Sequence, residues 1–313
     1  MFDEEVAAVI QSLDAGFPRV EEMTGPEARA AIAARRQPVR NPDVVAKTED
    51  RRIPGPGGEL PVRLYFPHHD GDGALPVVVF CHGGGFVFCD LESHDGFCRE
   101  LSARTESVVI SVDYRLAPEH RAPAAAHDAY AALTWAAENA RELGGDPDRL
   151  LIAGDSAGGN LAASACLLAR DAGGPGVAAQ VLIYPALDPA CDSASYRERG
   201  SGYGNTKAAM EWYWRQYLPA DGAVEPRYQV EPLAADTFRG LPPAIVVTAG
   251  LDPLSDDGRA YAAALARDGV AVTHRHYPGL FHGFLTIMPL QAGQSARDLL
   301  WHDLRAAAKR GAP

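Results

Sequence analysis

The chain has 313 residues, 47% of them apolar, so it is long enough to bury one large hydrophobic core or two modest ones. Its formal charge is −12, with 41 acidic and 29 basic residues, which disfavours a nucleic-acid partner because such partners require clustered Lys and Arg. The 31 glycines and 24 prolines form no repeat, which excludes collagen-like and low-complexity chains.

The N-terminus, MFDEEVAAVI, carries acidic residues where a signal peptide is positively charged. No segment approaches the ~18–20 apolar residues of a membrane span, so we expect none. The five cysteines are odd in number and show no CxxC spacing, so we expect reduced thiols and a cytoplasmic protein. A bridge from Cys89 to Cys81 or to Cys98 is the alternative.

Short β-rich runs alternate with helical runs along most of the chain. Residues 47–66 are expected to form one or two antiparallel strands. Further strands are predicted at 75–81, 107–114, 149–154, 178–185, 243–250 and 270–277, and helices at 93–104, 123–142, 157–170, 256–268 and 290–309. Near-continuous Val and Ile runs indicate strands covered on both faces, so this alternation predicts a mostly parallel sheet flanked by helices.

Two segments depart from this alternation. Residues 1–45 are polar and helical, and residues 190–220 contain the aromatic run MEWYWRQYLP. We expect both segments to lie above the sheet as a helical cover. Trp212 and Tyr213, in the second segment, either pack as ordinary core residues or line a pocket for an apolar group.

The stretch LLIAGDSAGGNLA places Ser156 between a predicted strand and a predicted helix. Gly154 and Gly158 stand two positions on either side of it, which gives a G-x-S-x-G nucleophile elbow in the strand–turn–helix context that the motif requires. A helix N-cap serine is the alternative, but it explains neither flanking glycine. We predict that Ser156 is a nucleophile.

A serine hydroxyl is a weak nucleophile unless a base accepts its proton. Downstream of Ser156, Asp252 and His282 each follow a different predicted strand, in the order Ser, Asp, His that is typical of α/β-hydrolases. Asp256 and Asp257 compete with Asp252 but look like first-turn helix acids that interact with the helix dipole. We therefore predict a catalytic triad of Ser156, Asp252 and His282.

Three consecutive glycines follow the predicted strand 75–81 in the motif HGGGF. Attack on a carbonyl creates an oxyanion, and backbone N–H groups of an HGGG-type loop stabilise it together with the N–H after the nucleophile. We predict that Gly83, Gly84 and Ala157 donate these hydrogen bonds. His82 is expected to organise the loop rather than to catalyse, and His94 looks like a surface-loop residue.

Six motifs occur in the order found in the hormone-sensitive lipase family of serine esterases, also called bacterial family IV, which the chain resembles over roughly residues 60–285. They are HGGGF (82–86), DYRLAPEH (113–120), GDSAGGN (154–160), YPALD (184–188), DPL (252–254) and HGF (282–284). The resemblance implies an α/β-hydrolase fold, with a mostly parallel eight-stranded sheet flanked by helices and a helical cap. The implied organisation is a single domain over 1–313, with cap elements 1–45 and 190–230 and a catalytic core formed by 46–189 and 231–313.

The resemblance also implies a serine carboxylesterase that hydrolyses short- to medium-chain carboxylic esters through an acyl-enzyme, with no metal and no organic cofactor. Phe86, Trp212 and Tyr213 are expected to bind the substrate. Family members commonly pair through the last strand and an adjacent helix, so a homodimer is expected. An amidase, peptidase or deacetylase that uses the same triad is the alternative. A receptor on the same fold would normally lack the catalytic histidine, which is present here as His282.

The chain departs from the family pattern at several positions. Cys89 stands where a glycine is more usual after HGGGF, and Ser255 replaces a commoner arginine after DPL. Arg121 and Ala122 stand where apolar or aromatic residues are expected. None of these changes removes a catalytic group, so they bear on substrate fit and loop packing rather than on the reaction.

Overall fold

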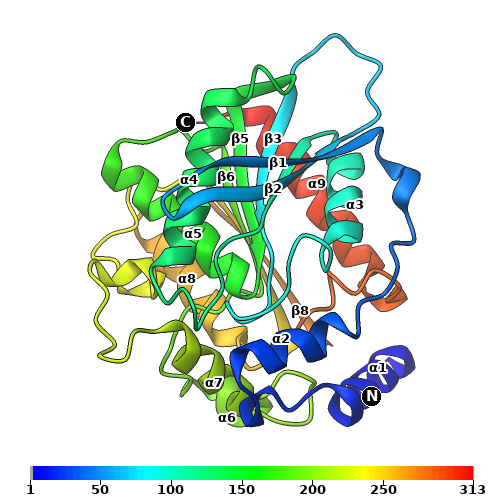
Figure 1. The fold of residues 1–313 in the computed structure, drawn as a ribbon, viewed down its shortest axis with the longest axis vertical. Helices are drawn as coiled ribbons and strands as arrows, with labels where there is room; N and C mark the ends of the chain where they lie inside the picture. The colour runs from blue at the N-terminus through cyan, green and yellow to red at the C-terminus, as the bar shows by residue number, and fades with distance from the viewer. Residues whose placement is uncertain (1–2, 313) are drawn as a thin grey trace.

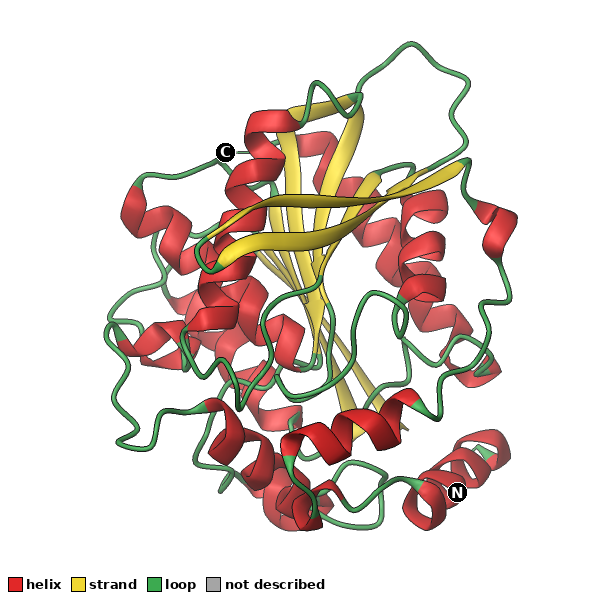
Figure 2. Cartoon of the chain, in the orientation of Figure 1, coloured by secondary structure: helices red, strands yellow, loops and turns green. Residues whose placement is uncertain are grey.

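The computed structural model describes residues 3–312, and a twisted eight-stranded sheet runs through the middle of them with helices on both faces (Figures 1 and 2). The strands are β1 (Lys47–Gly55), β2 (Gly58–Phe66), β3 (Leu75–Cys81), β4 (Val108–Val112), β5 (Gly145–Asp155), β6 (Ala179–Ile183), β7 (Ala244–Leu251) and β8 (Val272–Phe281). The α-helices are α1 (Glu4–Gly16), α2 (Gly25–Ala33), α3 (Asp95–Thr105), α4 (Ala124–Asn139), α5 (Ala157–Ala172), α6 (Ala194–Arg199), α7 (Lys207–Tyr217), α8 (Ser255–Arg267) and α9 (Gln294–Arg310).

The strand order across the sheet is β1-β2-β4-β3-β5-β6-β7-β8. β2 pairs antiparallel with both β1 and β4, and every other neighbouring pair is parallel. All residues of β4 and β6 are buried, as expected for strands covered on both faces. The predicted α/β-hydrolase fold, with its mostly parallel eight-stranded sheet, is confirmed.

Two hydrophobic clusters form the core, one on each face of the sheet. Alternate residues of β3 point to opposite faces, so Val77 and Val79 join one cluster while Val78 and Phe80 join the other. The first cluster contains buried residues of α4, α5 and α8, and the second contains buried residues of α3 and α9. The carboxyl ends of the central strands therefore meet at one edge of a rigid three-layer body, where loops carry side chains of several elements.

The edge strand β8 is longer than predicted. The expected end was residue 277, but β8 continues to Phe281, which pairs with Leu251 of β7. A proline is tolerated here because an edge strand has one side without partner strands. The extension places His282, the residue after Phe281, beside the end of β7.

The N-terminal helices and the helices of residues 190–230 gather at one end of the molecule, at the bottom of Figure 1. The Gly204 amide donates to Asp14 Oδ1 at 2.8 Å, and the Trp212 indole N–H donates to the Met23 carbonyl at 3.1 Å. These two parts of the chain, distant in sequence, are therefore in direct contact. Within residues 3–312, no helix combines the length and the apolarity that crossing a lipid bilayer requires.

Candidate active site

Ser156 lies in the sharp turn between β5 and α5. Its φ is +55°, a left-handed value that is strained for a residue with a side chain, and only 8% of its surface is exposed. The turn leaves no space beside it, because a Cβ on Gly158 would overlap the carbonyl of Cys81. Glycine is therefore required at that position of the predicted nucleophile elbow.

Ser156, His282 and Asp252 form a continuous row of hydrogen bonds. Ser156 Oγ lies 3.0 Å from His282 Nε2, and His282 Nδ1 lies 2.8 Å from Asp252 Oδ2. Asp252 is completely buried, and its Oδ1 accepts a hydrogen bond from the Leu254 amide at 2.9 Å. A carboxylate only accepts hydrogen bonds, so the Nδ1–H of His282 points at Asp252 and Nε2 is left to accept the serine proton.

The prediction that Gly83 donates to an oxyanion is wrong, because its N–H already donates to Asp155 Oδ1 at 2.8 Å. Within residues 3–312, by contrast, the N–H groups of Gly84, Gly85 and Ala157 have no hydrogen-bond acceptor. Ala157 is the first residue of α5, where the helix leaves its N–H unpaired. Gly85 is a candidate donor that the sequence reasoning did not name.

His94 is buried beside Asp155, so its interpretation as a surface-loop residue is also wrong. His94 is 8% exposed, and its Nε2 lies 3.2 Å from Asp155 Oδ1. Burial raises the pKa of Asp155, but the charge of His94 and the hydrogen bonds from His94 and Gly83 outweigh burial and hold that pKa below its usual value. A negative charge on Asp155 therefore anchors the Gly83 amide.

His82 is also buried under this loop. Its ring stacks on Tyr114 with the centroids 4.3 Å apart, and its Nδ1 lies 2.7 Å from the Gly83 carbonyl. Burial, and then electrostatic repulsion from the neighbouring His94 ring, lower the pKa of His82 to about 4, so the His82 ring is neutral at pH 7. These contacts suit the loop-organising position that the sequence suggested for His82.

Comparison with known proteins places this geometry in a family. A family model described as the alpha/beta hydrolase fold matches residues 78–286, which contain Ser156, Asp252 and His282. The chain belongs to this alpha/beta hydrolase family. The hydrolase is 44% identical to the carboxylic ester hydrolase LipN of Mycobacterium tuberculosis, over 86% of this chain and 72% of the relative. It is 42% identical to the ethyl acetate hydrolase of Pseudomonas putida, over 73% of this chain and 72% of the relative.

Solved structures of esterases share the whole fold of this hydrolase. A thermostable esterase from Pseudomonas putida ECU1011 superposes with a TM-score of 0.91 at 34% identity, over 98% of both chains. A hyperthermophilic esterase from Pyrobaculum calidifontis superposes with a TM-score of 0.88 at 39% identity, over 98% of this chain and 99% of that one. The resemblance drawn from the sequence motifs is confirmed.

A cavity of about 790 Å³ contains the row of hydrogen bonds in this hydrolase. Its lining includes Ser156, His282 and the three loop glycines, together with Phe88 from the loop after β3 and with Met210 and Tyr213 from α7. The Tyr213 ring meets the Phe88 ring edge to face at 5.5 Å between centroids. Tyr213 therefore lies where the substrate-binding prediction put it, and Phe88 is an additional wall residue that the sequence reasoning missed.

Phe86 and Trp212 do not line this cavity, so their prediction as substrate-binding residues is wrong. Phe86 is 1% exposed because its ring stacks on Tyr217, with the centroids 3.9 Å apart. Trp212 is 4% exposed, and its indole N–H is directed at Met23. Both rings belong to the hydrophobic core, which was the alternative considered for Trp212.

No cluster of three or more His, Cys, Asp or Glu side chains suited to a metal ion occurs among the described residues. All five cysteines of the hydrolase are free thiols, and all but Cys89 are buried. The disulfide alternatives through Cys89 are not formed.

Proposed function

We propose that this chain is a serine carboxylesterase that hydrolyses short- to medium-chain carboxylic esters through an acyl-enzyme. The observation that carries the proposal is the row Ser156–His282–Asp252, in which each hydrogen bond is 3.0 Å or shorter. The ester hydrolases named above as relatives support esters, rather than amides, as the substrate class.

In the first half of the reaction, His282 Nε2 accepts the proton of Ser156 while Oγ forms a bond to the ester carbonyl carbon. Asp252 holds the ring in the required tautomer and stabilises the imidazolium that forms. The carbonyl oxygen becomes an oxyanion. Collapse of this intermediate breaks the bond to the alcohol oxygen, which takes the proton from His282, and the acyl group stays on Ser156.

In the second half, water takes the place of the alcohol. His282 removes a proton from the water as its oxygen attacks the acyl carbon, and the second tetrahedral intermediate then expels Ser156 Oγ. The proton on Nε2 returns to the serine, and the carboxylic acid leaves. These steps use only water and residues of the chain.

We propose that the amides of Gly84, Gly85 and Ala157 donate hydrogen bonds to the oxyanion in both halves of the reaction. Their N–H groups have no acceptor among residues 3–312, and all three residues lie in or next to the turn and loop around Ser156. Donors already fixed in position need no reorganisation as the charge develops, which is why they accelerate the reaction. Asp155 contributes by holding the preceding residue, Gly83.

We propose that residues 1–45 and 190–230 together form a cap over the catalytic core, which comprises 46–189 and 231–313. The hydrogen bonds that join Gly204 to Asp14 and Trp212 to Met23 support a single cap built from both segments. Tyr213, from the second segment, contributes to the wall of the cavity.

The nucleophile is tested by removing its hydroxyl. Ser156→Ala should abolish ester turnover while its melting temperature stays close to that of the wild type, because the smaller side chain fits the same turn. A fluorophosphonate probe should label the wild-type protein at Ser156 and leave the variant unlabelled, as read by peptide mass spectrometry. Labelling at a different serine would contradict the proposal, and matched ester and anilide substrates distinguish esterase from amidase.

We also propose a homodimer formed through β8. This strand lies at the edge of the sheet and pairs only with β7 within residues 3–312. Its Arg275 forms an ion pair with Asp303 of α9. The edge therefore offers a second copy both backbone groups that have no strand partner and charged side chains. Light scattering after size exclusion should give twice the mass of the chain, and the mass of a single chain would contradict this proposal.

We propose that the enzyme works in the cytoplasm. The five free thiols support a reducing compartment. Cell fractionation of the native host, with immunodetection of the chain, tests this location, and recovery of the protein from the external medium would contradict it.

A further inference from the structure

A second cavity, of about 960 Å³, lies next to the cavity that contains Ser156. Four side chains line both of them: Phe17, Cys89, Thr286 and Ile287. The two spaces are therefore neighbours, separated by a partition of side chains from three segments of the chain. A volume of this size is comparable with that of ordinary small-molecule sites.

The second cavity has four main walls. One is α2 with the strap, which we define as residues 34–41; the others are the segment 89–97, the segment 113–116 and the loop 286–289. Its apolar lining includes Ile32, Val39, Phe97, Leu116 and Met288. Each of the four walls contributes an apolar residue, so the cavity suits an apolar group larger than a few methylenes.

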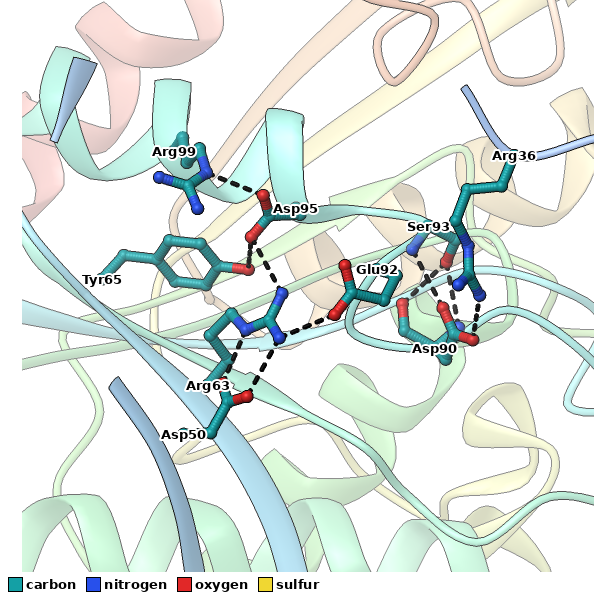
Figure 3. A network of polar contacts seen from close by, with 9 residues as sticks. All are labelled: Arg36, Asp50, Arg63, Tyr65, Asp90, Glu92, Ser93, Asp95 and Arg99. Carbon is teal, nitrogen blue, oxygen red and sulfur yellow. Dashed lines mark hydrogen bonds and ion pairs between the residues drawn. The ribbon is translucent and has the colours of Figure 1, made fainter. Parts of the chain in front are cut away.

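Ion pairs join the segment 89–97 to the strap and to β2, as Figure 3 shows. Arg36 of the strap pairs with Asp90, and both residues line the second cavity. Arg63 of β2 donates to Glu92 at 2.7 Å and to Asp95 at 3.2 Å. The carboxylates of Asp90 and Glu92 are thus matched by guanidinium groups, which hold the segment that carries Cys89 against its neighbours.

We infer that the second cavity binds the alcohol part of the ester, and that the enzyme prefers esters of bulky apolar alcohols such as arylmethyl alcohols. This inference rests on the proposed esterase function. The leaving alcohol oxygen takes its proton from His282 Nε2, so the alcohol part lies on the His282 side of the carbonyl. Thr286 and Ile287, which follow His282 in the chain, form the partition on that side. Tyr213 and Met210 line only the first cavity, which leaves that space for the acyl part.

Cys89 is the partition residue at which a small change tests the inference. Its φ is +67°, a left-handed value that glycine adopts without strain but that is unfavourable for cysteine. The chain therefore carries a side chain here against the local backbone preference, and the residue lines both cavities. Replacement of Cys89 by glycine removes this side chain without straining the backbone, so it should thin the partition and give the alcohol part more room.

The test compares kcat/KM for ethyl acetate, 2-naphthylmethyl acetate and ethyl hexanoate, measured by pH-stat titration. Val39→Trp and Leu116→Trp each fill the second cavity from a different wall and lie outside the first. Both variants should lower kcat/KM for the naphthylmethyl ester by about tenfold or more and leave the two ethyl esters within about twofold of the wild type. Cys89→Gly should raise the ratio of naphthylmethyl to ethyl acetate. Leu299→Trp, at an exposed position on α9, is the matched control and should change none of the values.

Other results overturn the inference. A selective loss with ethyl hexanoate would assign the cavity to the acyl part instead. A uniform loss with all three esters in both tryptophan variants, or no loss with any of them, would show that the cavity does not select the alcohol. Failure of the wild-type protein to hydrolyse any of the three esters would instead refute the proposed function itself, so the two failures are distinguishable.

Discussion

At the scale of single residues, the donor loop is set by the residue next to the nucleophile. Asp155 ends β5 one position before Ser156, and its carboxylate holds the Gly83 amide at 2.8 Å. This contact fixes the start of the loop relative to the serine. The two following glycines line the same cavity as Ser156, and their N–H groups have no acceptor within residues 3–312, so one carboxylate links the geometry of the nucleophile to that of the proposed oxyanion donors.

Gly84→Ala should therefore impair catalysis more than folding. The φ of Gly84 is +115°, and an added Cβ would overlap the carbonyl of Phe88, so the loop has to shift and misplace its donors. Loss of one oxyanion donor costs about 3–4 kcal/mol in the transition state, so kcat should fall by on the order of 10²–10³-fold.

Gly144→Ala is the matched control for this experiment. Gly144 also has a left-handed φ, of +73°, but no described residue beyond its chain neighbours has an atom within 4 Å of an added Cβ. The substitution carries the same type of backbone strain and should lower the melting temperature with kcat unchanged. A normal kcat for Gly84→Ala would refute the role proposed for the loop.

The sequence predicted those residues whose role follows from a local motif. Ser156, Asp252 and His282 each sit directly after a strand, so their meeting at one sheet edge follows from topology. Partners distant in the chain were not predictable in this way. The Gly83 amide donates to the carboxylate of Asp155, which lies 72 positions away in the chain. The Phe86 side chain is buried because it stacks against Tyr217 of α7. Such errors arise because a motif specifies residue types but not which neighbours compete for them.

At the scale of elements, the loop that follows β8 is tied to α9 by one buried arginine. Arg297 is 1% exposed, and its guanidinium donates to the carbonyls of Phe284, Ile287, Met288 and Leu290 at 2.8–3.5 Å. The loop begins directly after His282 and supplies two of the four partition residues, Thr286 and Ile287. We therefore propose that Arg297 is a positioning residue for His282, acting through the carbonyls of this loop.

Arg297→Ala should reduce kcat by about 10- to 100-fold, because small displacements of a reacting group are costly. The substitution leaves a hole lined by carbonyl oxygens, which suits a guanidinium ion. Millimolar guanidine hydrochloride should therefore restore part of kcat in this variant, although the same additive inhibits or does not affect the wild type. This rescue, measured in steady-state assays, separates positioning from a general loss of stability.

Arg275→Ala is the control for chemical rescue. Arg275 also contacts α9, through Asp303, but within the described part of the chain it donates no hydrogen bond to a carbonyl of the loop after His282. Guanidine should not increase its activity. If Arg297→Ala keeps normal kcat, or if guanidine activates both variants equally, the positioning role is incorrect.

At the scale of the whole molecule, the fold was predictable because its strongest signals are periodic. Runs of Val and Ile flanked by helical segments specify a covered parallel sheet, and the predicted strands all appear in that sheet. The cavities were not predictable, since they lie between segments as distant as residues 17, 89 and 287. The volume between elements depends on how they pack, which neither periodicity nor motif spacing records.

The fold also buries a histidine, His82, whose protonation changes the stability of the whole protein. His82 is completely buried between the sheet and the donor loop, and its pKa is lowered from 6.5 to about 4, chiefly by burial. Asp155 beside it also has a pKa below its ordinary value of 3.8. Protonation of either group is therefore easier in the unfolded chain than in the folded one, so both link the stability of the fold to acid.

The free energy of unfolding should fall as the pH is lowered from about 6.5 to about 4. In this window the unfolded chain protonates His82 while the folded protein does not, so acid favours unfolding; the contribution of Asp155 is lost below pH 3.8. The share of His82 is on the order of 3 kcal/mol over the window. Urea unfolding at a series of pH values should show a shallower pH dependence of the free energy of unfolding for His82→Asn than for the wild type.

The control is Tyr114→Phe, which removes only a hydrogen bond to the His82 carbonyl at 2.8 Å. This variant should lower the free energy of unfolding equally at every pH in the window. An unchanged pH slope in His82→Asn would mean that another buried group controls the acid sensitivity of the fold.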